Sequence, residues 1–119
     1  MTGMGVSATA SAVTTLAQRK ASEAARRLQA AEAVVDALGA YARRECGTFV
    51  VFGSYVTGTM RFDSDLDVLI DFPPERAAAA WCFVEDVCAE HGVPPDIHDA
   101  STSWPVFTQR VRAKGLALP

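Results

Sequence analysis

The apolar segments Thr48–Phe52 and Leu66–Phe72 are too short to be helices, and they carry the β-branched and aromatic residues that favour strands. Gly53 follows the first segment and Pro73-Pro74 follow the second, so both are bounded by residues that end strands. Strands this short cannot bury a core by themselves. The chain therefore needs helices packed against a small sheet.

Helical patterns surround these strands and predict the layer that covers them. The segment before Thr48 is rich in alanine, with apolar residues three and four positions apart, which favours a long helix that Gly39 could divide. Ser54 is placed to cap a one-turn helix, Tyr55–Thr57. The order α-β-α-β-α-β-α predicts an α+β domain, a small sheet flanked by helices. The remaining predicted elements are helices from Thr14 or Thr15 to Gly47, from Glu75 to Glu90 and from Ser101 or Ser103 to Lys114, with Val106 and Val111 inward, and a strand at Pro95–Asp99.

Length, charge and cysteine usage limit the classes of protein to which this chain can belong. Its 119 residues form one domain, predicted over residues 14–119, after a flexible tail of residues 1–13.

The net charge of −3 argues against broad, nonspecific binding of nucleic acid. From residue 48 onward there are ten acidic and five basic groups, an excess that favours cations as ligands. Three cysteines without a disulfide or zinc pattern, and no apolar run typical of a signal peptide or membrane span, predict a cytoplasmic protein without membrane contact.

Gly53-Ser54 is a candidate phosphate-binding element. Glycine lets the backbone turn sharply and approach a ligand closely. A helix that starts directly after a strand directs free backbone N–H groups, and here the Ser54 hydroxyl, at one point, which suits a phosphate. The alternative is an ordinary connection between a strand and a turn, and for Gly-Ser alone we favour that alternative.

Asp65 and Asp67 are candidate metal ligands. Residues two apart on a strand share a face, so both carboxylates are expected to project together while Leu66 points into the core. Two close carboxylates repel each other unless a cation lies between them, and Mg²⁺ prefers carboxylate and phosphate oxygens. The alternative is a solvated acidic edge, or a pair neutralised by Arg61.

Taken together, these residues resemble the signature of the polymerase-beta-like nucleotidyltransferase superfamily, which is Gly-Ser, ten residues, then Asp-x-Asp. The short chain is similar to the minimal nucleotidyltransferases, which are often the antitoxin half of a pair with a HEPN-domain toxin. Where the family often has Ala-Arg-Gly, this chain has Val56-Thr57-Gly58, which leaves Arg61 to supply the charge. The matching residues are Gly53, Ser54, Asp65 and Asp67, with Gly58 and Arg61 at frequent intervening positions.

The resemblance implies a mixed sheet and a third metal-binding carboxylate on the next strand. Asp96 matches that position, and Asp99 is the second choice because it would point to the opposite face. His98 shares the expected face of Asp96 and is predicted at the rim of the site. The implied catalytic and metal-binding residues are Asp65, Asp67 and Asp96, and the implied phosphate-binding residues are Gly53, Ser54 and Arg61.

The activity implied by the resemblance is Mg²⁺-dependent transfer of a nucleoside monophosphate, with two Mg²⁺ ions and ATP or another NTP. The expected acceptor is a hydroxyl on a HEPN-type toxin, which would make this chain an enzymatic antitoxin resembling a protein adenylyltransferase. One alternative is a binding antitoxin that neutralises its partner stoichiometrically. Another is a small-molecule adenylyltransferase, disfavoured because the chain has no room for a second lobe. Self-association of the chain stays open.

Overall fold

The computed structural model describes residues 15–119, and the predicted tail, residues 1–13, lies outside the described residues. The four strands form one mixed sheet in the order β3-β2-β1-β4: β1 is antiparallel to β2 and β4, and β2 is parallel to β3. This confirms the α+β prediction and adds a short strand, β4. The elements are α2 (Leu16–Glu45), β1 (Thr48–Phe52), α3 (Ser54–Thr57), β2 (Leu66–Asp71), α4 (Pro74–His91), β3 (Pro95–Asp99), α5 (Pro105–Lys114) and β4 (Leu116–Leu118).

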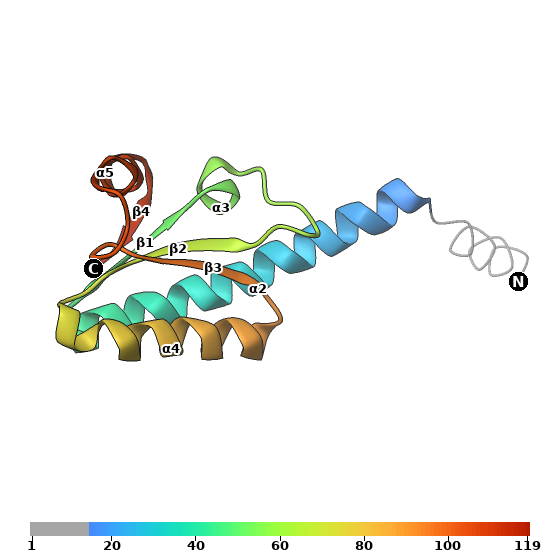
Figure 1. Ribbon diagram of the computed structural model, residues 1–119. Helices are drawn as coiled ribbons and strands as arrows, with labels where there is room; N and C mark the ends of the chain where they lie inside the picture. Colours follow the sequence, from blue (N-terminus) through green and yellow to red (C-terminus); the bar gives the residue numbers. More distant parts are fainter. Residues whose placement is uncertain (1–14) are drawn as a thin grey trace, which may run out of the picture.

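Helices cover both faces of the sheet (Figure 1). α2 and α4 lie on one face, and α3 and α5 lie on the other. The main core fills the space under α2 and α4, where Leu38, Val68 and Val84 are fully buried. A smaller cluster lies under α5 and contains Val50, Leu69 and Val111. Alternate residues of β1 and β2 thus serve two cores, as expected for strands buried on both faces.

α2 is a single continuous helix, so the predicted division at Gly39 is wrong. Gly39 is buried within the helix, and a break there would expose the apolar residues around it. The helix ends at Cys46, which adopts a left-handed conformation with φ of 56°. Its first half extends beyond the sheet, and Leu16 is 65% exposed there. None of the helices within residues 15–119 combines the length and apolar character needed to cross a bilayer.

α5 begins at Pro105, later than predicted, with Trp104 at its N-cap and proline in its first turn. Val111 is buried as expected, but Val106 is 67% exposed. Residues five positions apart cannot share one face of a helix, which explains the error. The helix is tied to the sheet by Arg112, whose Nε and Nη2 donate to the two carboxylate oxygens of Asp71 at 2.9 and 3.0 Å.

Thr108 offers a test of the packing between α5 and the sheet. Its hydroxyl is buried and has no hydrogen-bond partner within the described part of the chain. Thr108→Val keeps the shape and removes the unsatisfied group, so we expect the free energy of unfolding to rise by about 1 kcal/mol in urea denaturation. Thr108→Ser is the matched control, because it keeps the hydroxyl and loses a buried methyl group. A lower stability for the valine variant would show that the hydroxyl is satisfied in solution.

Candidate active site

Gly53 forms a sharp turn between β1 and α3. Its φ of +75° is left-handed, and its carbonyl accepts hydrogen bonds from the N–H groups of Val56 and Thr57, each at 3.1 Å. α3 begins at Ser54, one residue earlier than predicted, so Gly53 and not Ser54 occupies the N-cap. The helix ends after one turn at Gly58, which has φ of +73°. The turn therefore leaves the first N–H groups of α3 without helical partners.

The Gly53 turn lies directly against Asp67. Phe52 is the register partner of Asp67, which brings the end of β1 to the start of β2. A Cβ added at Gly53 would overlap the carboxylate oxygen Oδ2 of Asp67. Only glycine allows this approach, so the predicted phosphate-binding turn and one predicted metal ligand occupy a single site.

Asp96 lies beside Asp67 on the neighbouring strand. The two residues are register partners in the parallel pair of β2 and β3. Burial raises the pKa of Asp67 to about 6, with further contributions from the charge of Asp96, a hydrogen bond with Asp96 and the charge of Asp65, while His98 opposes the shift. His98 Nε2 lies 3.4 Å from Asp96 Oδ1, which places the histidine at the rim of the site as predicted.

Asp65 is exposed and immediately precedes β2, so it lies at the end of the strand and not within it. The backbone is held in place on both sides of Asp65. Arg27 Nη1 of α2 donates to the Ser64 carbonyl at 2.5 Å, and the Leu66 N–H donates to the Pro94 carbonyl at 2.9 Å. Asp65 therefore lies close enough to Asp67 for its charge to raise the pKa of Asp67. The loop that carries Asp65 is anchored to α2.

Two other predicted residues lie apart from this cluster. Arg61 lines a hollow with Lys20 and Met60, beside α2. Asp99 accepts hydrogen bonds from the N–H and hydroxyl of Ser101 at 2.9 and 2.8 Å and lines a hollow beside α4. Of the two aspartates considered for the third carboxylate, the structure brings Asp96 to Asp67. The part of Arg61 in phosphate binding stays a prediction.

Comparison with known proteins identifies the family. The family model described as "Nucleotidyltransferase domain" matches residues 21–114. This chain belongs to that family. A solved structure of a candidate minimal nucleotidyltransferase superposes with a TM-score of 0.61 at 27% identity, covering 75% of this chain and 93% of that one. No curated protein sequence matches this chain.

A second solved structure shows the same fold. It is described as a crystal structure of a toxin-antitoxin with AMP-PNP, and it matches with a TM-score of 0.53 at 23% identity, covering 74% of this chain and 72% of that one. The resemblance to minimal nucleotidyltransferases drawn from Gly53-Ser54 and Asp65-Leu66-Asp67 is thus confirmed at the level of family and fold.

The carboxylates of this nucleotidyltransferase domain fit a divalent cation that a bound nucleotide helps to hold. Within residues 15–119, no three side chains of Asp, Glu, His or Cys are grouped so as to hold a metal ion by themselves. Asp67 and Asp96 form an adjacent pair with Asp65 nearby. Mg²⁺ is usually bound by one or two carboxylates together with substrate phosphates and waters. The pair and the Gly53 turn supply the protein's share of such a site.

The raised pKa of Asp67 predicts how pH changes the stability of the metal-free domain. Between pH of about 4 and 6 the folded chain holds a proton on Asp67 that the unfolded chain has released, so the free energy of unfolding falls as pH rises through this range. After allowance for solvent screening of a half-exposed group, we expect a loss of about 1 kcal/mol. Urea denaturation at pH 4 and 7 measures it. Mg²⁺ should recover the loss at pH 7, and an equal pH slope in Asp67→Asn would contradict this explanation.

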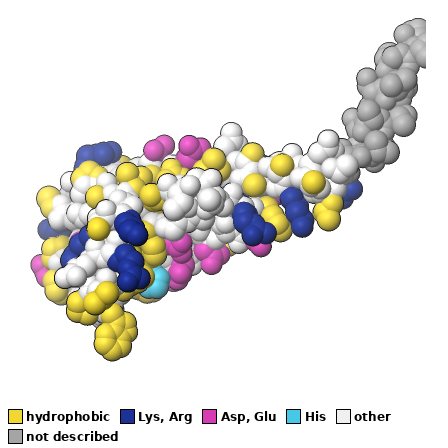
Figure 2. All heavy atoms as spheres, turned by 90° about the horizontal axis from the view of Figure 1, so that it is seen from above, with side chains coloured by type: hydrophobic (Ala, Val, Ile, Leu, Met, Phe, Trp, Pro, Cys, Tyr) yellow, Lys and Arg dark blue, Asp and Glu magenta, His cyan; other side chains and the backbone are white. Residues whose placement is uncertain are grey.

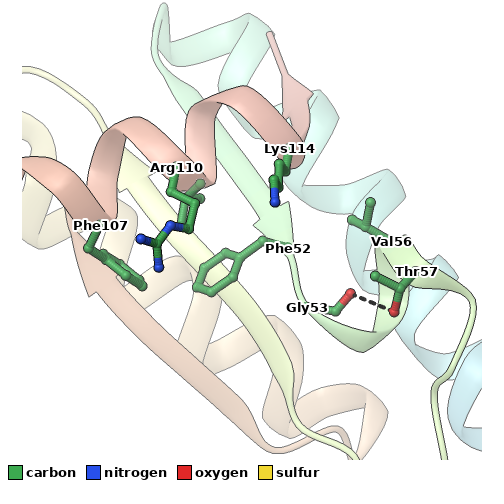
Figure 3. A pocket seen from close by; sticks show the side chains of 8 residues that line it. Phe52, Gly53, Val56, Thr57, Phe107, Arg110 and Lys114 are labelled. Atoms are coloured by element: carbon green, nitrogen blue, oxygen red, sulfur yellow. Dashed lines mark hydrogen bonds between the residues drawn. The ribbon is translucent and has the colours of Figure 1, made fainter.

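A pocket of about 260 Å³ adjoins the Gly53 turn on the side of α5. Its apolar walls include Phe52 and Phe107, and Arg110 and Lys114 project into it from α5 (Figure 3). Acidic side chains gather beside basic side chains and a histidine on this face of the molecule (Figure 2). Arg110 and Lys114 carry no role predicted from the sequence. Their spacing of four residues near the end of a helix was the available signal.

Proposed function

We propose that this domain transfers a nucleoside monophosphate, AMP from ATP in the first instance, onto an acceptor hydroxyl in a Mg²⁺-dependent reaction. The observation that carries the proposal is the contact between the Gly53 turn and Asp67, with Asp96 at the side of Asp67. A turn that suits phosphate and a pair of carboxylates that repel each other share one site. A metal–nucleotide complex satisfies both.

In the proposed reaction the acceptor oxygen bonds to the α-phosphorus of the nucleotide, and the bond from that phosphorus to the bridging oxygen breaks, releasing pyrophosphate. The N–H groups and the Ser54 hydroxyl at the start of α3 hold the phosphate chain in line for this displacement. Asp67 or Asp96 accepts the proton of the acceptor hydroxyl. Divalent ions at this site, two in the full proposal, supply charge neutralisation and a lowered pKa for the bound hydroxyl.

The proposed acceptor is a side-chain hydroxyl, such as that of a tyrosine, on a toxin partner of the HEPN type. Two observations support this choice. A structure of the same fold is described as a toxin-antitoxin with AMP-PNP, an analogue of ATP. Residues 15–119 also form one sheet with helices on both faces, without a second lobe to hold a small acceptor.

The test is transfer of label from α-³²P-ATP, with Mg²⁺, to the protein encoded next to this one. We expect the partner to be labelled by the wild type and not by Asp67→Asn. Asp63→Asn is the matched control, because Asp63 is exposed on the same loop and should leave transfer unchanged. Neutralisation of the partner that survives Asp67→Asn, without labelling, would overturn the proposal in favour of a stoichiometric binding antitoxin.

A further inference from the structure

The pocket beside Gly53 is built from two opposite walls (Figure 3). β1 and α3 supply one wall with Phe52, Gly53 and Thr57, and α5 supplies the other with Arg110 and Lys114. The Thr57 hydroxyl lies at 3.3 Å from the Gly53 carbonyl, at the edge of the turn that touches Asp67. Gly53 therefore lines the pocket and also lies against Asp67 of the acidic pair.

The three basic residues of α5 are used in two different ways. Arg112 is paired with Asp71 on the sheet. Within residues 15–119, neither Arg110 nor Lys114 has an ion-pair partner, and both project into the pocket. Two like charges four residues apart on a helix repel each other. An anion held between them would relieve this repulsion.

We propose that Arg110 and Lys114 bind the β- and γ-phosphates of the nucleotide, an inference that rests on the proposed function. The volume of about 260 Å³ is smaller than a site that encloses a drug-sized molecule, so the pocket takes one part of a nucleotide. The two cations select the most anionic part. The apolar side chains of Phe52 and Phe107 in the walls lower the local dielectric and strengthen the contact between cation and phosphate.

This arrangement also divides the charges of the site between two groups. The carboxylates of Asp67 and Asp96 lie side by side on β2 and β3, against the Gly53 turn, and suit the metal near the reacting phosphate. Arg110 and Lys114 lie on α5 and suit the leaving pyrophosphate. Positive charge at the leaving group stabilises the charge that develops there as the bond breaks. This chain has Thr57 where the family often has an arginine, and in this proposal α5 supplies the missing positive charge.

The experiment measures binding of α,β-methylene-ATP, which cannot undergo the cleavage, and of AMP, by calorimetry with Mg²⁺. In the double variant Arg110→Gln/Lys114→Gln we expect the Kd for α,β-methylene-ATP to rise on the order of 30-fold and the Kd for AMP to change little. Inorganic triphosphate should compete in the wild type and lose this ability in the double variant. Arg19→Gln/Arg43→Gln removes the same charge from exposed positions of α2 and should bind as the wild type does.

The outcomes separate this inference from the function on which it rests. Wild-type affinity for α,β-methylene-ATP in the double variant, with weakened binding in Asp67→Asn, would overturn the role of Arg110 and Lys114 and leave the proposed function standing. An equal loss for AMP and α,β-methylene-ATP would assign the pocket to the nucleoside and overturn the inference. A wild-type protein that binds neither ligand would overturn both. Unchanged thermal midpoints confirm that the exposed substitutions leave the fold intact.

Discussion

Asp67→Asn is expected to abolish nucleotidyl transfer while it stabilises the metal-free domain at neutral pH. The amide carries no charge to hold a cation or accept a proton, so we expect single-turnover transfer to fall by at least about 10³-fold. The same change removes a carboxylate that burial and Asp96 make unfavourable when ionised, since the pKa of Asp67 is raised to about 6. We therefore expect a gain of about 1 kcal/mol, or about 4 °C in Tm, by calorimetry at pH 7.

Asp71→Asn is the matched control for this prediction. It makes the same substitution four residues further along β2, where the side chain points to the same face of the sheet. Asp71 is paired with Arg112, so its loss should lower stability slightly and leave transfer unchanged. A destabilised Asp67→Asn, or one that keeps wild-type transfer, would contradict the account of Asp67 as an electrostatically unfavourable functional residue.

Gly53→Ala is expected to disable the site through sterics alone. The new Cβ would overlap Asp67 Oδ2, and alanine is strained at φ of +75°. We expect a loss of about 2–3 kcal/mol in the free energy of unfolding and a loss of transfer comparable to that of Asp67→Asn. Urea denaturation and the labelling reaction measure the two effects.

Gly58→Ala isolates the contact with Asp67 from the cost of the backbone conformation. Gly58 has nearly the same φ, +73°, but open space around the position of the added Cβ. It should cost about 1 kcal/mol, the strain term alone. Adding Asp67→Ala to Gly53→Ala should recover the part of the loss that the contact causes, without recovering transfer. Equal losses in the two glycine variants would show that Gly53 does not need to approach Asp67.

The sequence predicted the elements that carry the chemistry because their signals are local. β1 and β2 are marked by β-branched and aromatic residues and by the glycine and prolines that bound them. The spacing from Gly53-Ser54 to Asp65 and Asp67 identified the family, and the resemblance pointed to Asp96, which is the register partner of Asp67. These features depend on the period of a strand and on the chemistry of a few side chains, which one sequence contains.

The remaining features depend on tertiary packing. β4 has three residues and exists only because it pairs with β1. The projection of Arg110 and Lys114 into the pocket depends on how α5 rests on the sheet, which no local pattern of residues predicts. Arg27 of α2 donates to the carbonyl of Ser64, a contact between segments far apart in the sequence that no local pattern predicts.

The most direct measurement is the location of a paramagnetic ion on the protein. Mn²⁺ is titrated in the presence of α,β-methylene-ATP, and the broadening of assigned backbone amide resonances is mapped on the sequence. We expect broadening to be strongest around Gly53, Asp67 and Asp96 and to be lost in Asp67→Asn. Broadening centred elsewhere in the domain, or an unchanged pattern in Asp67→Asn, would contradict a metal–nucleotide site at the junction of β1, β2 and β3.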